Sequence, residues 1–426
     1  MTERVEKARP LLRELAALPD VQTGLLLLRH CASFCRVSYS SRVTPPGALR
    51  TSLAAFAWEQ ASLATSIGGL GLRLANLHAP AAYVASLTQT VAVCIGLYPA
   101  YDLAHNPGLL AAIATHNLEV APPDHLRVPV PPQTRQRELS QALDRAVASR
   151  LLTPSPGREA NRAHFRLLEL PGAGAWLHAP PSEALGLHVE PRLFRTMVQL
   201  RLRLPVAPTD VACPLCDGVA DRFGAHSLCC PCGGDRIKRH NRLRSVVATR
   251  SQATGLGVEV EKADLLPLRP DDDGADGGRG SGLRRPADVW VAQWGLQGPA
   301  AFDLAVTSGI KAGPMLAESA RSSQAAVESY EARKRNHLHT DQLCRSEGLQ
   351  FLPLVAEACS GGWGPTAVST WRTLGGLIAA RSGDTPAAET DRLLQSLAIT
   401  LQRENARAVL RRLPQGGEEA SPFAAP

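Results

Sequence analysis

Apolar residues recur at helical spacing through the first 110 residues of the chain. Asp20 stands just before one apolar run, where a carboxylate can accept hydrogen bonds from the N-terminus of a helix. Further helices are expected near 48–66 and over 79–97, with the glycine-rich turn at 68–72 between them. The pattern therefore predicts a helical region at the start of the chain.

The segment from Asn76 to Tyr101 raises the question of a membrane, because it contains no Asp, Glu, Lys or Arg. A membrane-spanning helix needs about 20 predominantly apolar residues in succession. Here Ser86, Thr88 and Gln89 interrupt the apolar run. A helix buried in a protein core is therefore the favoured interpretation.

The pattern becomes mixed in residues 111–205, which are interpreted as a connector. A proline-rich break at 122–132 precedes a helix expected over 133–152, and a second helix is expected around 191–202. Near the C-terminus, apolar spacing predicts a helix over 389–412 that is followed by a disordered tail.

Strand-like runs replace the helical spacing in 287–294 and 300–307, and a short link with glycine and proline joins them. This is the pattern of a β-hairpin. If the turn centres between the two runs, Asp288 lies opposite about residue 305, and Asp303 is its diagonal neighbour on the same face. Two carboxylates in this relation, with Cα atoms about 7 Å apart, can share one divalent cation.

A third acid and a cation accompany this pair. The strand expected at 257–261 carries Glu259 and Glu261, either of which could join the aspartates or lie at a solvated edge. Residues spaced at i, i+3 and i+4 predict one long helix over 316–338. Lys334 falls on its apolar stripe, where a lysine is costly unless its charge is paired or its side chain reaches solvent.

The composition adds a charge bias and a cluster of metal-binding residue types. The 426 residues carry a net charge of +7 with a pI of about 9.0, which leans toward a polyanionic partner. Of the 10 cysteines, five lie between Cys213 and Cys232. Such clustering indicates a metal site in a reducing compartment rather than a disulfide framework. Residues 1–20 are charged and amphipathic, so a signal peptide is not expected.

Four soft ligands form the core of the cluster, and their spacing suits tetrahedral zinc: Cys213-x2-Cys216-x9-His226-x3-Cys230. Because four protein ligands leave no open position, such a zinc would stabilise structure rather than perform chemistry. Cys229 and Cys232 are surplus, so the fourth ligand could be any of three cysteines. Among them, Cys230 gives the most usual interval after the histidine.

A basic helix is expected directly after the cluster. The segment contains no acid and carries the cations Arg236, Lys238, Arg239, Arg242, Arg244 and Arg250. These cations can face outward while the apolar residues face inward, namely Ile237, Leu243, Val246 and Val247. Such a face would follow a phosphate backbone, and a merely solvated face is the alternative. His240 lies within the segment and could contact a phosphate or support the acids.

The order of these motifs resembles the restriction-like endonuclease of site-specific non-LTR retrotransposons, a member of the PD-(D/E)XK nuclease fold. The family pattern is a CCHC knuckle, an (R/K)H(N/D) motif, and an (R/K)PD motif followed after a short interval by a second acid. The corresponding residues here are Cys213, Cys216, His226, Cys230, Arg239-His240-Asn241, Arg285-Pro286-Ala287-Asp288 and Asp303. The strand at 351–355 and the turn at 361–364 are similar to the family's closing segment.

The resemblance implies roles for individual residues. Asp288 and Asp303 would bind Mg²⁺, with Glu261 as a third acid, and Lys334 would be a relocated catalytic lysine. The zinc knuckle would support binding of the duplex. The residues expected to contact DNA are Arg236, Lys238, Arg239, His240, Arg242, Arg244 and Arg285.

Two positions depart from the family pattern. Ala287 is inserted before the first aspartate, so that the motif reads Pro-Ala-Asp. Ala305 occupies the position two residues after the second aspartate, where the fold's standard lysine would stand. Catalysis would then depend on a lysine from elsewhere, either Lys334 or Lys311.

Residues 1–100 are more weakly similar to the region that follows the polymerase palm in the same elements, including the stretch Gly68–Ala75. The Tyr/Phe-x-Asp-Asp signature of the polymerase itself is absent from the sequence. The chain therefore resembles the C-terminal portion of a retroelement protein, without reverse transcription.

With this resemblance, the sequence predicts an α+β multidomain protein with a restriction-endonuclease-like α/β core and a central mixed sheet. The expected divisions are a thumb-like helical region at 1–110, a connector at 111–205, the CCHC knuckle at 206–235, the endonuclease domain at 236–380, and a C-terminal helix and tail at 381–426.

The function implied is a Mg²⁺-dependent DNA endonuclease in the nucleus, with a structural Zn²⁺, retroelement RNA as a second candidate partner, and no membrane. Two alternatives belong to other classes of protein. One is a zinc-knuckle protein that binds nucleic acid but whose nuclease has decayed. The other is a zinc-stabilised interaction protein without a nucleic-acid role.

Overall fold

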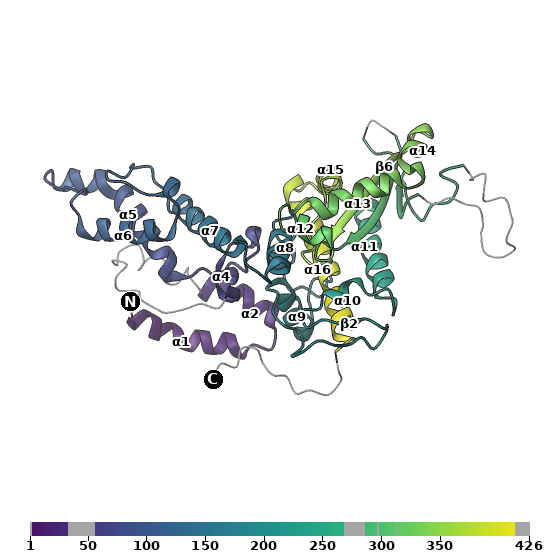
Figure 1. Ribbon diagram of the computed structural model, residues 1–426. Coiled ribbons are helices and arrows are strands. Elements are labelled where there is room, and N and C mark those ends of the chain that lie inside the picture. The colour runs from purple at the N-terminus through teal and green to yellow at the C-terminus, as the bar shows by residue number, and fades with distance from the viewer. Residues whose placement is uncertain (1, 33–55, 268–285, 296–297, 312, 414–426) are drawn as a thin grey trace. The chain divides into compact units, whose positions relative to one another are not determined.

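The computed structural model describes residues 2–32, 56–267, 286–295, 298–311 and 313–413 (Figure 1). The chain divides into two compact units, Met1–Phe165 and Arg166–Pro426. Each unit has a hydrophobic core of its own.

The described part of the first unit is helical. Asp20 accepts hydrogen bonds from the amides of Gln22 and Thr23, which confirms it as the cap of a helix. The elements are α1 (Thr2–Ala17), α2 (Val21–Leu27), η1 (Leu28–Ala32), α4 (Phe56–Ser62), η3 (Thr65–Ile67), α5 (Ala75–Leu97), α6 (Pro107–Glu119), η4 (Pro122–Asp124), α7 (Gln136–Leu152) and α8 (Glu159–Leu167), the last of which runs into the second unit.

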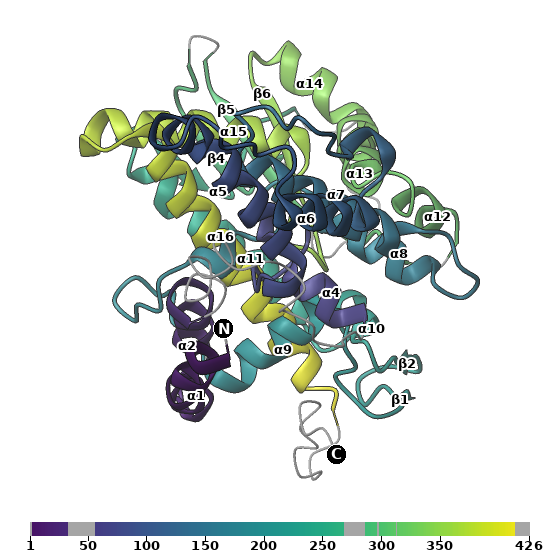
Figure 2. The same cartoon turned by 90° about the vertical axis from the view of Figure 1, so that its left-hand side faces the viewer.

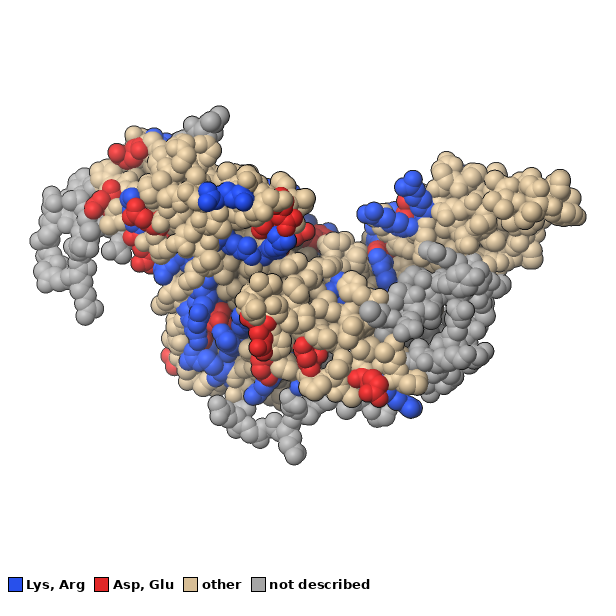
Figure 3. All heavy atoms as spheres, turned by 180° about the vertical axis from the view of Figure 1, so that it is seen from behind, with Lys and Arg blue, Asp and Glu red and all other residues tan. Residues whose placement is uncertain are grey.

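Helix α5 is buried over only part of its length. Residues 78–85 pack into the core that α5 forms with α6 and α7. Val93 and Leu97, in the later turns, are 63% and 83% exposed, so the expectation of a buried helix holds for the first half alone. Within the described residues, α5 is the helix long and apolar enough to cross a membrane, although 39% of its most apolar stretch is buried. Figure 3 shows few charged side chains on the surface of the first unit at the end where α5 lies.

The second unit combines a four-stranded sheet with helices on both faces. Its elements are η5 (Ala175–His178), α9 (Pro191–Arg201), β1 (Val211–Ala212), β2 (Val219–Ala220), α10 (Ala225–Cys229), α11 (Asp235–Gln252), β3 (Val258–Val260), β4 (Val289–Val291), β5 (Ala300–Thr307), α12 (Pro314–Ser319), α13 (Ala325–Asn336), η7 (His337–His339), α14 (Thr340–Ser346), β6 (Gln350–Glu357), α15 (Pro365–Ser382) and α16 (Pro386–Leu410).

The sheet has the strand order β3-β4-β5-β6 and is mixed. Strands β3, β4 and β5 are antiparallel neighbours, whereas β5 and β6 run parallel. A helical connection through α12, α13 and α14 joins the parallel pair, as parallel strands require. The expected mixed α+β class, with a central mixed sheet, is thus confirmed.

The two faces of the sheet bury alternate residues of its strands. Phe302 and Leu354 face a core shared with α11, α15 and α16. Ala301 and Phe351 face a second cluster that includes Cys344 of α14. In Figure 2, the yellow helix α16 runs beside α11, and the two helices are in contact. The acidic residues discussed below lie at one end of β4 and within β5, between these helical layers.

The register of the hairpin differs from the expectation. A partner near residue 305 for Asp288 would place Val289 opposite residue 304, but Val289 pairs with Phe302. Strand β4 is also shorter than the run 287–294 that was expected, whereas β5 matches its run. The difference arises because β4 is short, so the connection between β4 and β5 can have more than one length. Apolar alternation alone does not determine that length, and the register depends on it.

The single long helix expected over 316–338 is wrong. Ser322 and Ser323, which favour turns over helix interiors, separate α12 from α13. Leu338 and His339 have positive φ angles of 51° and 54°, so the helix ends before them.

The expected divisions of the chain also differ from the units observed. Position 110 falls inside α6, and position 380 falls inside α15. Helix α16 is not a separate C-terminal piece, because its residues Leu393, Leu397 and Leu401 are fully buried in the core beneath the sheet.

Candidate functional site

The four expected zinc ligands converge in the second unit. The ligand atoms of Cys213, Cys216, His226 and Cys230 all lie within 4.8 Å of one another. The Cys216 Sγ atom is 3.6 Å from Cys230 Sγ and 3.4 Å from His226 Nε2. Bonds of about 2.0–2.3 Å to a tetrahedral zinc give ligand separations of about 3.5–3.8 Å. This group can hold a metal ion, and its chemistry suits zinc.

The local fold holds these ligands in place. The short strands β1 and β2 form a hairpin, and the Cys213 amide donates to the Gly218 carbonyl at 2.8 Å. A Cβ atom at Gly218 would stand only 2.9 Å from His226 Cε1, so glycine is required there. Asp221 accepts a hydrogen bond from the His226 amide at 2.6 Å and so fixes the start of α10.

The Cys213 thiol is prepared for a cation. Burial raises its pKa, but hydrogen bonds from the Leu215 amide and from His226 outweigh burial and bring the pKa to about 6. A thiolate is the form of cysteine that binds zinc. The fourth position of the group belongs to Cys230, since Cys229 packs beside Cys359 and Cys232 is exposed.

Asp288 and Asp303 meet where β4 and β5 pair. The Asp288 amide donates to the Phe302 carbonyl at 2.8 Å, directly before Asp303 in the chain. The Asp288 carboxylate accepts from the Leu304 amide at 2.7 Å, and thus serves β5 as a backbone carbonyl would. Both side chains are only 16% exposed. The two acids are therefore neighbours in a largely buried setting.

The side chains of Lys334 and His240 reach these acids from opposite helical layers. Lys334 of α13 places its Nζ atom 2.9 Å and 3.1 Å from the two carboxylate oxygens of Asp303. His240 of α11 places Nε2 2.9 Å from an oxygen of Asp288. Lys334 is thus paired, as its position on the apolar side of a helix requires. Lys311, the other candidate lysine, is exposed.

The electrostatics of Asp303 reflect this surrounding. Burial raises the pKa of Asp303, the nearby Lys334 ammonium opposes the rise, and the charge of Asp288 adds to it. The Asp303 carboxylate is thus attracted by the Lys334 ammonium and repelled by the Asp288 carboxylate. Such a pair can accept a divalent cation between its members.

Glu261 joins the site through its backbone rather than its carboxylate. Its amide donates to the Asp288 carbonyl at 3.0 Å, and its φ angle of 51° ends the strand. Its side chain is 46% exposed and pairs with Arg244 of α11. Glu259 pairs with Lys262 at 2.6 Å. The third acid therefore lies next to the pair, with its carboxylate turned toward α11.

Helix α11 presents His240 and Arg244 to the acids from positions four residues apart, on one helical face. Three other cations of this helix are exposed, as expected: Arg236, Lys238 and Arg242. Arg285, the remaining DNA-contact candidate, lies outside the described residues.

Arg239 is not on the outer face, so the expectation for it is wrong. Its side chain is buried, and its Nη1 atom donates to Asn405 Oδ1 of α16 at 2.7 Å. Burial lowers the pKa of Arg239. Ile237, which was expected to face inward, is 67% exposed. Packing on α16 gives α11 a different orientation about its axis from the one expected. As a result, Arg239 faces the core and Ile237 faces solvent.

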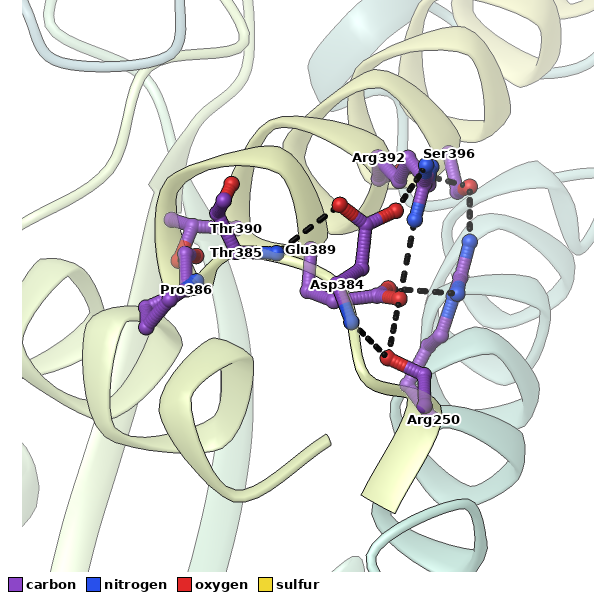
Figure 4. A network of polar contacts seen from close by, with 9 residues as sticks. Arg250, Asp384, Thr385, Pro386, Glu389, Thr390, Arg392 and Ser396 are labelled. Carbon is purple, nitrogen blue, oxygen red and sulfur yellow. Dashed lines mark hydrogen bonds and ion pairs between the residues drawn. The ribbon is translucent and has the colours of Figure 1, made fainter. Parts of the chain in front are cut away.

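Contacts with α16 hold α11 at both ends. At the start of α11, Asp235 accepts from Arg411 at 2.6 Å and from Arg412 at 2.7 Å. At the other end, Arg250 reaches toward Ser396 and Glu389, as Figure 4 shows. Sequence reasoning missed Arg244 and Asn405 as positioning residues. The four-residue spacing of His240 and Arg244 was the available signal for the first.

The sequence was also compared with known proteins. No model of a protein family matches the chain, and no curated protein shows significant similarity to it.

Proposed function

We propose that this protein is a metal-dependent endonuclease that cleaves or nicks DNA. The convergence of Asp288 and Asp303, with Lys334 on one side and His240 on the other, carries the proposal. We further propose that strands β3–β6 and their flanking helices are a restriction-endonuclease-like core of the non-LTR retrotransposon type. The first unit would then be a remnant of the thumb region of the polymerase.

Asp288 and Asp303 are the residues that would hold Mg²⁺, with Glu261 next to them as a further oxygen donor. Their fit to a hard cation rests on the donor set, since both are carboxylates with restricted exposure. When bound, such an ion activates water and stabilises the departing oxygen of a phosphodiester.

The protein's own residues would orient the acids and stabilise charge. His240 and the Leu304 amide together fix both oxygens of Asp288. Lys334 opposes the rise in the pKa of Asp303 that burial causes, and its ammonium would stabilise negative charge that develops on a phosphate. His240 and Lys334 would have separate roles, because each contacts a different aspartate.

DNA would be bound by the exposed cations of α11, namely Arg236, Lys238 and Arg242, next to the zinc knuckle. The net charge of +7 supports a polyanionic partner. Retroelement RNA is a second candidate substrate for the same surface. We also propose a nuclear location, because this role requires access to DNA.

A protein that binds nucleic acid without cleaving it is the second candidate function. The observation that favours it is that both aspartates already have a side-chain partner at 2.9 Å, His240 for Asp288 and Lys334 for Asp303. The alanine at position 305, where the fold's standard lysine would stand, points the same way.

Nicking of supercoiled plasmid in Mg²⁺ separates these two functions. We expect the zinc-loaded wild-type protein to produce open-circular DNA and Asp303→Asn to do so at least about 100-fold more slowly, since the variant lacks a metal ligand. Asp391→Asn, an exposed acid on α16, is the matched control and should retain wild-type activity. Equal nicking by the wild type and Asp303→Asn would leave only the binding function.

A further inference from the structure

A groove of about 290 Å³ lies between α11 and α16, away from the aspartates. The residues that line it include Arg242, Ser245, Thr400, Arg403, Glu404 and Arg407. Helical spacing explains the arrangement, because positions three and four apart share a face. Arg242 and Ser245 follow this spacing on α11, and Thr400, Arg403 and Arg407 follow it on α16.

The groove holds an excess of positive charge. Three arginines face one glutamate, and Glu404 is already paired with Arg407. Burial lowers the pKa of Arg403, and the charges of Arg407 and Arg242 lower it further. Arg403 is therefore repelled by Arg407 and by Arg242, and the charge of Glu404 offsets this in part. An anion placed between them would relieve that repulsion.

The groove is built rather than incidental. Arg403 donates to the carbonyls of Gly186 and His188 at 2.8 Å and 2.9 Å, which fixes its guanidinium at the groove. Glu404 is 6% exposed and forms an ion pair with Arg407 of the same helix. The Ser245 hydroxyl already donates to the Asn241 carbonyl at 2.9 Å, whereas the hydroxyl of Thr400 adds a donor that suits an oxyanion. Arginine in a fixed orientation is the side chain best suited to phosphate, because its planar fork can donate two parallel hydrogen bonds.

Its place on α11 connects the groove to the proposed nuclease. His240 contacts Asp288 from the same helix, two positions before Arg242. Residues two apart point to nearly opposite sides of a helix, whose diameter with side chains is about 10–12 Å. The groove therefore lies on the side of α11 away from His240 and the acids.

We propose that this groove binds a backbone phosphate of the nucleic acid, on the side of α11 away from the bond that is cleaved. The inference rests on the proposed function and adds to it Arg403 and Arg407, which lie in a helix far along the sequence from the basic segment. It assigns to α16 a direct part in binding, beyond its role in supporting α11.

The test measures binding of a short labelled duplex by fluorescence anisotropy, as a function of salt concentration. The full-length, zinc-loaded protein carries Asp303→Asn, so that cleavage does not interfere and no chelator is needed. We compare Arg242→Gln, at an exposed position, with Ser245→Asp, which adds an acid to the groove at an exposed position. Arg372→Gln is the control, because Arg372 is an exposed arginine of α15 that does not line the groove.

We expect each groove variant to weaken binding about 5- to 20-fold and Arg242→Gln to reduce the slope of log K against log salt by about 0.9, the value for one phosphate contact. The control should match its parent. If the wild-type protein nicks plasmid but both groove variants bind like their parent, the groove inference is overturned together with the assignment of Arg242 to the DNA surface, while the proposed nuclease activity stands. If the duplex does not bind to the parent, the proposed function fails as well.

Inorganic phosphate distinguishes a free anion from a nucleic-acid backbone. Added phosphate should compete with the duplex for the parent protein more strongly than a salt without phosphate or sulfate does at equal ionic strength. This additional competition by phosphate should be smaller for Arg242→Gln. Phosphate binding that depends on Arg242, without any effect of Arg242→Gln on the duplex, would assign the groove to a free anion and overturn the inference.

Discussion

The contact between Lys334 and Asp303 joins two groups that would each be unfavourable alone. A lysine on the apolar side of a helix needs a partner, and a largely buried carboxylate needs a cation. Burial nevertheless raises the pKa of Asp303, so the ammonium offsets the cost of desolvation only in part. At the scale of single residues, this pair would place an ammonium and a carboxylate next to the substrate of the proposed nuclease.

The raised pKa has a consequence for the pH dependence of cleavage. Because a metal ion binds the ionised form of Asp303, protons should compete with Mg²⁺ at a pH above the ordinary carboxyl value of 3.8. We expect single-turnover nicking to rise with pH through this raised pKa. Increasing the Mg²⁺ concentration should move the midpoint of the profile to lower pH.

The pH profile has a clear contrary result. A rate that is constant down to about pH 4, or a midpoint that does not respond to Mg²⁺, would exclude ionised Asp303 as a metal ligand. Thermal unfolding recorded over the same range checks that the protein remains folded. Here the sign is fixed by linkage. A raised pKa in the folded state means that the contribution of Asp303 to stability declines as pH increases through that pKa.

The sequence singled out the candidate residues of the site, but it did not predict their geometry. Asp288, Asp303 and Lys334 were selected from residue types and spacing, and the structure brings them together. Sequence spacing left His240 with two possible roles. Its contact with Asp288 depends on how α11 packs across the sheet, which local sequence does not specify.

Helix α11 links the acids, the basic surface and the knuckle because α16 holds it along its length. Arg239 bonds to Asn405 in its middle, while Asp235 and Arg250 are held at its two ends. An arginine in a basic run reads as a surface residue in the sequence. Burial of Arg239 could not be predicted, since its partner follows 166 positions later.

Substitution of Arg239 should therefore affect stability more than binding. We expect Arg239→Ala to lower the free energy of unfolding by about 2–4 kcal/mol, because it removes a charge-assisted hydrogen bond and leaves Asn405 buried without it. Lys238→Ala, at the exposed neighbouring position, should change the stability by less than about 0.5 kcal/mol. Urea denaturation measures both. Equal effects of the two variants would show that Arg239 is not a core residue in solution.

The knuckle gives a second prediction at this scale, which concerns ligand identity. We expect Cys230→Ser to lose most of its zinc and to melt at a lower temperature, because three remaining ligands bind zinc weakly. Cys229→Ser and Cys232→Ser should retain about one zinc per chain. Metal content measured by mass spectrometry after dialysis decides between them. Zinc loss in Cys232→Ser with retention in Cys230→Ser would move the fourth ligand.

The success of prediction varied among elements for physical reasons. Long helices such as α7 and α16 follow their apolar spacing, and β5 matches its run of alternating residues. The helix expected over 316–338 failed because apolar spacing continues across Ser322 and Ser323, although the backbone turns there. Register failed because the hairpin's connection, not its strands, decides which residues face one another.

At the scale of the molecule, the second unit is assembled from distant segments. Its core joins α11, β4, β5, α15 and α16, so residues from 243 to 401 contribute to one hydrophobic cluster. The first unit has a separate helical core. The boundary at Phe165 was not predicted, because residues 111–205 offer neither a flexible linker nor a change in composition at that point.

We propose that this assembly brings Asp288 and Asp303 around one divalent cation. Titration of the zinc-loaded, full-length protein with Mn²⁺, followed by electron paramagnetic resonance, tests it directly. We expect about one Mn²⁺ to bind per chain and to be displaced by Mg²⁺, with this binding lost in Asp303→Asn and retained in Asp391→Asn. Unchanged Mn²⁺ binding in Asp303→Asn would contradict the claim.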